Sequence, residues 1–277
     1  MSAHQDLAVG RIPFLVCAPF FHSSLAGMPG FRFVDGVPSF LNAELRAGRV
    51  DAAPSSCIEY GQRFRDYRLL PGISTSSRLE MRSVLFLSGK PWEELQDQPV
   101  ALSPASATSN VLFQILCARR FRVRPRLLGG AEAETAAAVG RVFIGDRALE
   151  EALSGRWPHR YDLGELWGKW QGLPFSFGLW MVRDEACQAR PSSVARLQSL
   201  LRAALESFRT NPQAALDAWI KAYPTALPRP LMLRFYETAD YGFSPEHALS
   251  LQTFYRLAWE DGHLQEVPEL RFVAPAD

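Results

Sequence analysis

The sequence predicts an α/β protein with an open, largely parallel β-sheet that is covered by helices on both faces. Three observations carry this prediction. Short apolar stretches alternate with amphipathic ones along the chain, 47% of the residues are hydrophobic, and several apolar stretches end in small polar turns. Strands that alternate with helices favour a parallel sheet. In such sheets the ligand lies beyond the carboxyl ends of the strands, which is where the polar turns fall.

The first part of the chain shows this alternation clearly. An amphipathic stretch at residues 39–48 ends in Gly48, a typical C-terminal residue of a helix, and the buried-type stretch 50–56 follows it. The expected elements, in order, are strands at residues 9–15 and 31–34, a helix at 39–48, a strand at 50–56, a helix at 58–64 and a strand at 81–88.

The second part of the chain begins with a further series of strand and helix signals and ends in helices that we expect to have no strand between them. The chain would cross twice between two lobes, through hinge segments at 85–89 and 175–179. We expect a larger lobe of residues 1–88 and 178–277 and a smaller inserted lobe of residues 89–177. The expected elements are βα signals at 99–121, 124–128, 141–149 and 161–171, a strand at 175–182, and helices at 192–209, 212–222 and 245–261.

The length and the net charge of the chain indicate which kind of molecule it binds. The chain has 277 residues, which fits one large domain or two lobes, and its 30 Lys and Arg nearly balance its 29 Asp and Glu. This balance argues against a nucleic-acid surface or a polybasic membrane patch, so we expect a small-molecule partner, with a homodimer left open. The first residues resemble no signal peptide, and no apolar run is long enough to span a bilayer. We therefore expect a cytoplasmic location.

The cysteines predict neither a metal site nor a disulfide framework. Cys17, Cys57, Cys117 and Cys187 are dispersed, with no close pair and no nearby histidine. We expect them to be free, buried thiols.

The turn at residues 103–109 is the most informative local feature. An apolar run stops at a turn rich in Ser and Thr, and a helical pattern follows at once. The first turn of a helix has unpaired N–H groups and a partial positive charge, so it can seat a carboxylate or phosphate. The alternative is that Ser106 or Thr108 only caps the helix. The turn at residues 54–56 occupies the equivalent place after an earlier strand.

A set of motifs in the stretch 10–180 resembles the chorismate dehydratase of the futalosine route to menaquinone. Together, and in this order, they are specific. The resemblance implies a two-lobed fold similar to type 2 periplasmic solute-binding proteins, used in the cytoplasm as an enzyme. The motifs read GRIPFL from Gly10, PSFLN from Pro38, GRVDAAPSSCIEY from Gly48, SVLFLS from Ser83, SATS from Ser106, IGDRAL from Ile144 and DLGELWGKWQGLPF from Asp162.

The resemblance implies the elimination of water from chorismate to give 3-[(1-carboxyvinyl)oxy]benzoate. The site must hold two carboxylates, and hydroxyl and N–H groups can do so without a metal or an organic cofactor. The base is left open, because a correctly posed carboxylate of the substrate can itself take the ring proton. The residues that the resemblance assigns to this binding are Ser55, Ser56, Ser106, Thr108 and Ser109.

Three further residues are candidates for the reaction. The family pattern places Ser83 against the ligand, the alternative being that it is only a small packing residue. Asp146 is a candidate for orienting the ligand hydroxyl, although an Asp at the start of a helix is more typical of an N-cap. Val16 stands where the family usually has an Asn after the first strand, so an amide has become an aliphatic group that cannot orient a hydroxyl.

Two other functions remain open. The same cleft in a binding protein would close over a small carboxylate without converting it. The related enzyme that makes 1,4-dihydroxy-6-naphthoate shares the fold, but its histidine-bearing motif has no counterpart in this chain. Formation of an aromatic product from chorismate distinguishes the enzyme from the binding protein.

Overall fold

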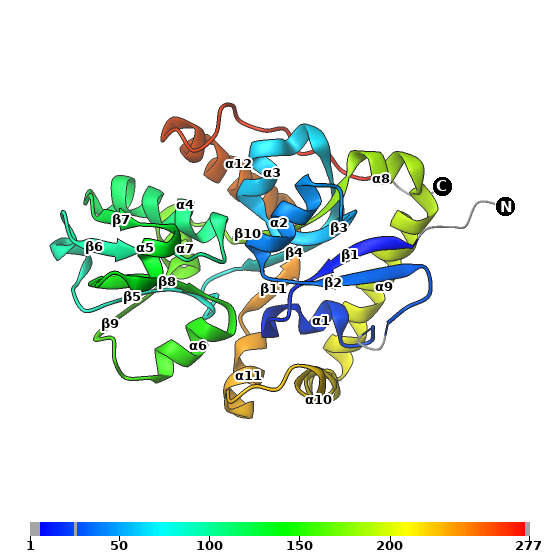
Figure 1. Cartoon of the computed structure of the whole chain (residues 1–277), viewed down its shortest axis with the longest axis horizontal. Coiled ribbons are helices and arrows are strands. Elements are labelled where there is room, and N and C mark those ends of the chain that lie inside the picture. Colours follow the sequence, from blue (N-terminus) through cyan, green and yellow to red (C-terminus); the bar gives the residue numbers. More distant parts are fainter. Residues whose placement is uncertain (1–5, 25–26, 275–277) are drawn as a thin grey trace.

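The protein has two lobes, each built on one mixed β-sheet flanked by helices (Figure 1). The structure is a computed structural model that describes residues 6–24 and 27–274. The predicted α/β class and two-lobed fold are confirmed. The larger lobe is formed by the N-terminal and C-terminal parts of the chain. The smaller lobe, green in Figure 1, is formed by the middle of the chain.

The sheet of the larger lobe has the strand order β11-β4-β10-β3-β1-β2. Strands β1, β2 and β3 are parallel, whereas β10 runs antiparallel to both β3 and β4, and β11 runs antiparallel to β4. The strands are β1 (Leu7–Arg11), β2 (Phe31–Asp35), β3 (Ala52–Ser56), β4 (Tyr67–Ser77), β10 (Phe175–Arg183) and β11 (Ala239–Gly242).

The sheet of the smaller lobe has the order β7-β6-β8-β5-β9. Strands β6, β7 and β8 are parallel, and β5 runs antiparallel to β8 and β9. Each sheet is therefore mixed, with both parallel and antiparallel strand pairs. The strands are β5 (Val84–Ser88), β6 (Pro99–Ala101), β7 (Arg126–Leu128), β8 (Gly140–Ile144) and β9 (His159–Asp162).

Helices cover both faces of each sheet, as the amphipathic stretches predict (Figure 1). The larger lobe carries α1 (Ala18–Phe21), α2 (Pro38–Arg46), α3 (Cys57–Arg63), α8 (Asp184–Ala189), α9 (Pro191–Thr210), α10 (Pro212–Ala222), α11 (Arg229–Tyr236) and α12 (Pro245–Glu260). The smaller lobe carries α4 (Ala107–Ile115), α5 (Gly130–Thr135), α6 (Gly145–Leu153) and α7 (Leu163–Gln171).

The points where the chain crosses between sheets differ from the expected hinge segments. Strand β5 lies wholly within the smaller sheet, and β10 lies in the larger sheet from Phe175 onward. The chain therefore changes sheets at residues 78–83 and 172–174, and the hinge segments expected at 85–89 and 175–179 are wrong. The lobe boundaries expected at residues 88 and 178 stay a prediction, and the sheets favour earlier positions for both.

Each lobe has its own aromatic packing. In the larger lobe the rings of Trp180 and Phe20 pack edge-to-face, with their centroids 5.6 Å apart. In the smaller lobe Trp92 stacks on Phe121 at 4.2 Å. Helix α12 joins the lobes, since it packs against both β10 and α4. The two aromatic groups belong to one buried hydrophobic cluster, which includes Phe20, Trp180 and Trp92 and is therefore continuous between the lobes.

Candidate functional site

An open cavity of about 540 Å³ lies between the two lobes. Both sheets contribute to it through the ends of strands and the first turns of helices, as predicted for an α/β fold. Its polar walls are formed by hydroxyl side chains of Ser55, Ser56, Thr75, Ser83, Ser106 and Ser109.

The end of β3 places Ser55 and Ser56 at the cavity. The Oγ atom of Ser55 is buried and has no hydrogen-bond partner among the described residues. A buried hydroxyl without a partner costs free energy, so it is suited to bind a polar group that enters the cavity. The backbone N–H of Ser56 donates to Oδ1 of Asn42 at 3.4 Å, which ties the strand end to α2.

The first turn of α4 brings Ser106 and Ser109 to the same cavity. Ser106 is the N-cap of the helix: its Oγ accepts the backbone N–H of Ser109 at 3.2 Å, and the two hydroxyl oxygens lie 2.9 Å apart. Capping and lining the cavity are therefore not alternatives for Ser106. The helix N-terminus adds partial positive potential at this wall.

Thr108 differs from its neighbours, because its hydroxyl is used within the protein. Its Oγ1 accepts the backbone N–H of Ile58 at 3.2 Å and donates to Sγ of Cys57 at 3.4 Å. Thr108 is not among the residues that line the cavity. Its side chain joins α4 of the smaller lobe to α3 of the larger one, so the structure gives no support to its expected contact with ligand.

Ser83 lines the cavity at the end of the first crossing, 3% exposed. The crossing is fixed by Asp162, whose carboxylate accepts the backbone N–H groups of Met81 at 3.1 Å and Arg82 at 2.5 Å. The carbonyl of Ser83 in turn accepts the N–H of Gly145 at 2.8 Å. The backbone around Ser83 is thus held on both sides.

Asp162 was not predicted as a site residue, although it is the first residue of the motif DLGELWGKWQGLPF. Besides holding the crossing, it is the N-cap of α7 and accepts the N–H groups of Gly164 at 2.9 Å and Glu165 at 3.1 Å. A sequence signal existed, since an Asp before a helical pattern predicts a cap. That signal does not predict the hydrogen bonds by which Asp162 also holds the crossing, about eighty residues earlier in the chain.

Asp146, at the first turn of α6, lies behind the cavity wall and is not among the lining residues. Its Oδ1 accepts the backbone N–H of Leu15 at 2.9 Å, and the hydroxyl of Tyr236 donates to the carbonyl of Leu15 at the same distance. The backbone N–H and C=O of Leu15 are thus both held by side chains. Burial raises the pKa of Asp146 to about 6.

The short helical turn Leu15–Cys17 that these bonds hold brings Val16 and Cys17 to the cavity. The side chain of Val16 is 9% exposed and adds an apolar contact where the family pattern has an amide. Burial raises the pKa of the Cys17 thiol, and nearby Asp146 adds to this effect. The thiol is therefore neutral in the physiological pH range.

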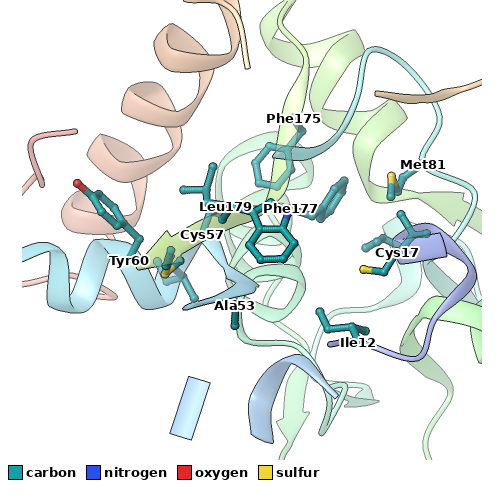
Figure 2. Packing of buried hydrophobic residues seen from close by; sticks show 14 of the residues in the cluster. Ile12, Cys17, Ala53, Cys57, Tyr60, Met81, Phe175, Phe177 and Leu179 are labelled. Atoms are coloured by element: carbon teal, nitrogen blue, oxygen red, sulfur yellow. The ribbon is translucent and has the colours of Figure 1, made fainter. Parts of the chain in front are cut away.

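Apolar side chains form the rest of the cavity wall, and of these only Val16 was predicted from the sequence. Figure 2 shows Ile12, Cys17 and Met81 close together at one side of the packed cluster. Within the described chain, no Lys, Arg, Asp or Glu lines this cavity. An anion would therefore be held by hydroxyl groups, backbone N–H groups and the α4 dipole.

The four cysteines are free, and Cys17, Cys57 and Cys117 are buried as expected, whereas Cys187 is partly exposed, contrary to the expectation. Within residues 6–24 and 27–274, no group of three His, Cys, Asp or Glu side chains is arranged to hold a metal ion. Over the same residues, no helix is both long and apolar enough to cross a membrane.

Comparison with solved structures shows the fold. A protein from Archaeoglobus fulgidus superposes with a TM-score of 0.74 at 17% identity, covering 95% of this chain and 100% of the other. The periplasmic aliphatic sulphonate-binding protein SsuA from Escherichia coli gives 0.66 at 15% identity, covering 98% and 93%. The chain therefore has the fold of periplasmic binding proteins.

Sequence comparison identifies relatives with a named activity. A chorismate dehydratase from Thermus thermophilus is 28% identical over 261 residues, which cover 79% of this chain and 94% of the relative. A chorismate dehydratase from Campylobacter jejuni is 32% identical over 177 residues, covering 61% and 64%. The model of the menaquinone biosynthesis family matches residues 7–260. Since this match spans most of the chain, the protein belongs to the menaquinone biosynthesis family.

Proposed function

We propose that the protein is a hydro-lyase that dehydrates chorismate to 3-[(1-carboxyvinyl)oxy]benzoate in menaquinone biosynthesis, in the cytoplasm. The observation that carries this proposal is the cavity between the lobes, with its five serine side chains and, among the described residues, no charged lining side chain. The named relatives, both chorismate dehydratases, support the same substrate. Neutral donors and a helix N-terminus suit a ligand that brings two negative charges of its own.

The reaction needs little from the protein beyond position and polarity. The ring C–H bond at the ether-bearing carbon and the C–O bond of the ring hydroxyl break, a ring double bond forms, and water leaves. Aromatisation drives the reaction forward, so the barrier lies in proton removal and in the poor leaving group. A carboxylate of the substrate, held close to the proton, serves as the base.

The lining hydroxyls have distinct proposed tasks in this reaction. Ser106, Ser109 and the N-terminus of α4 bind one carboxylate, and the unpartnered Ser55 with Ser56 binds the other. Ser83, fixed by the crossing, donates a hydrogen bond to the departing hydroxyl. Asp146 acts indirectly, by holding the peptide that precedes Val16. The apolar lining excludes water from the reacting ring.

A binding protein for a small carboxylate is the second candidate, and one observation favours it. Val16 places an aliphatic group at the cavity where the family pattern has an amide, and the fold is shared with a protein that binds sulphonates. The related enzyme that makes 1,4-dihydroxy-6-naphthoate is a weaker candidate, since both named relatives are dehydratases.

Incubation of the purified protein with chorismate tests the proposal. Chromatography with ultraviolet detection should show a new aromatic product. Its mass should be lower than that of chorismate by one water molecule. A control with Ser83→Ala and Ser109→Ala together should lose the activity but keep its fold by circular dichroism. Tight chorismate binding without any product would instead support the binding protein.

A further inference from the structure

A second hollow adjoins the cavity between the lobes and carries the charge that the cavity lacks. It has an open volume of about 1130 Å³ and lies on the smaller lobe, between α5 and α6 and over β8. Phe14 and Ile144 line both spaces, so these two side chains form the boundary between them. A ligand that crosses this boundary passes directly from one space into the other.

Two arginines line this hollow. The guanidinium of Arg147, on α6, lies 5.5 Å from the ring centroid of Phe143, and the Arg147 side chain is exposed. Arg141, on β8, donates to the backbone carbonyls of Ala133 and Ala136. Among the described residues, neither arginine has a carboxylate partner within 4.0 Å. The guanidinium of Arg141 is held by the two carbonyls, so the exposed Arg147 is the better placed of the two to meet an incoming anion.

The balance of charge in the hollow remains positive. Glu134 is the one acidic side chain among the described residues that line it, against Arg141 and Arg147. A concave surface of one sign concentrates ions of the opposite sign and raises their rate of association. Among the described residues, no charged side chain lines the neighbouring cavity, so its walls attract an anion only through the partial charge of the α4 N-terminus.

The boundary can open by a small movement. The ring of Phe14 packs against Gly145, where an added Cβ would lie 2.7 Å from Cδ2 of Phe14, and Gly145 has a φ of +64°. The ring therefore rests on bare backbone and is not covered by a side chain at this point. Phe14 is half-buried, and a change in its rotamer would open a path between the two spaces.

We propose that this hollow is the entrance for a dicarboxylate dianion, that Arg147 and Arg141 attract the dianion, and that Phe14 gates its passage into the cavity. This inference rests on the proposed function only for the identity of the substrate, and any compact dicarboxylate dianion should follow the same route.

Association kinetics at varied ionic strength test the role of Arg147. The probes are the fluorescent dianion 5-aminoisophthalate, followed by stopped-flow fluorescence, and chorismate, followed by kcat/KM. At low ionic strength Arg147→Gln should slow the association of 5-aminoisophthalate about 3- to 10-fold, and the difference should shrink as salt screens the charge. The matched control is Arg160→Gln, because Arg160 is an exposed arginine on β9 of the same lobe and does not line the hollow.

The outcomes separate this inference from the proposed function. If wild type dehydrates chorismate but Arg147→Gln and Arg160→Gln behave alike at every ionic strength, the entrance is wrong and the dehydratase stands. If chorismate is not converted but association of 5-aminoisophthalate depends on Arg147, the entrance stands without the dehydratase. If wild type binds 5-aminoisophthalate no faster than the neutral isophthalamide, the entrance is also wrong.

The gate has its own test. Phe14→Ala removes the ring from the boundary, so both association and dissociation of 5-aminoisophthalate should be faster than in wild type, with less change in affinity. The control is Phe40→Ala, because Phe40 is an exposed aromatic side chain on α2 that lines neither space. Unchanged rates in Phe14→Ala, with native circular dichroism, would overturn the gating role.

Discussion

At the scale of single residues, two hydroxyls one position apart at the start of α4 have different partners. Ser109 lines the cavity, whereas Thr108 is bonded to Ile58 and Cys57 inside the protein. Ser109→Ala should weaken chorismate binding by about 1–3 kcal/mol with little loss of stability, because a charge-assisted hydrogen bond is lost. Thr108→Val should instead lower the free energy of unfolding by about 1–3 kcal/mol, because the buried N–H of Ile58 loses its acceptor.

Calorimetry with chorismate and urea unfolding of both variants measure the two effects. Each variant serves as the control for the other, since they differ in position by one residue of the same helix. If Thr108→Val lost more affinity for chorismate than Ser109→Ala, the assignment of the two hydroxyls would be reversed.

Val16 is the residue where this chain departs from the family pattern. Its side chain is 9% exposed and borders the cavity, so a polar replacement need not be buried in the core. Val16→Asn should raise kcat on chorismate, because an amide can orient the departing hydroxyl, and should leave the melting temperature within a few degrees of wild type. Val16→Ala controls for the change in size.

Steady-state rates and thermal unfolding of the two variants decide this prediction. A rise in kcat that also occurs in Val16→Ala would point to space and not to the amide. If wild type and Val16→Asn both fold and both leave chorismate unchanged, the dehydratase proposal must give way to the binding protein.

At the scale of elements, Asp146 links the start of α6 to the turn Leu15–Cys17. Its pKa is about 6 in the folded protein, against a usual value of 3.8. Between these two pH values the folded state binds more protons than the unfolded state, so the free energy of unfolding falls as pH rises through this window. Asparagine can accept the same N–H bond without a buried charge. Asp146→Asn should therefore be about 3 kcal/mol more stable than wild type at pH 7.5 and nearly equal to it at pH 3.5.

Urea unfolding at the two pH values measures this difference. Asp217→Asn is the control, because Asp217 is an exposed residue in a surface ion pair with Arg229, and such pairs contribute about 0–1 kcal/mol. An equal stability difference for Asp146→Asn at both pH values would show that the charge of Asp146 does not reduce the stability of the folded protein.

Asp162 joins α7 to the crossing that carries Ser83, since its carboxylate accepts four backbone N–H groups. Asp162→Ala leaves all four without this acceptor and should lower the free energy of unfolding by at least about 2 kcal/mol. Ser106→Ala, which removes a cap with one backbone bond, should lower it by about 1 kcal/mol. Urea unfolding compares the two. Equal losses would mean that the crossing finds other partners when Asp162 is absent.

The elements also show which parts of the fold a sequence can predict. Helices with clear amphipathic patterns were found, and residues 212–222 match α10 at both ends. Strand β4 was missed, because Pro71 and Gly72 interrupt its apolar pattern and four hydroxyl residues end it. Strand β11 was missed because it is short and has no apolar run. The expected strand 81–88 began too early, because Arg82 has a φ of +61°, which no local pattern reveals.

In the candidate site, too, features with a local sequence signal were predicted, and features that depend on distant contacts were not. The polar turns after β3 and before α4 were predicted as ligand-facing, because small hydroxyl residues at a strand end form a local signal. The separate task of Thr108 and the second task of Asp162 depend on contacts between segments far apart in the chain. Only the folded arrangement of the lobes brings these segments together.

At the scale of the whole molecule, the two lobes are joined by crossings at residues 78–83 and 172–174 and by α12, which packs on both lobes (Figure 1). The bond from the Leu15 N–H to Asp146 also spans the lobes, and it lies beside the cavity. Ligand contacts from both walls favour the closed arrangement, so ligand should shift the population toward it.

Small-angle scattering tests this closure. With saturating 5-aminoisophthalate the radius of gyration should fall toward about 19 Å, the value expected for a compact chain of 277 residues. Asp146→Ala lacks the bond to Leu15 that spans the lobes, so its radius without ligand should exceed that of wild type. Ligand should still close this variant, at a higher concentration, because the cavity walls are unchanged. Superimposable scattering curves for both proteins, with and without ligand, would show that the lobes do not move, and the ligand must then enter a cavity of fixed width.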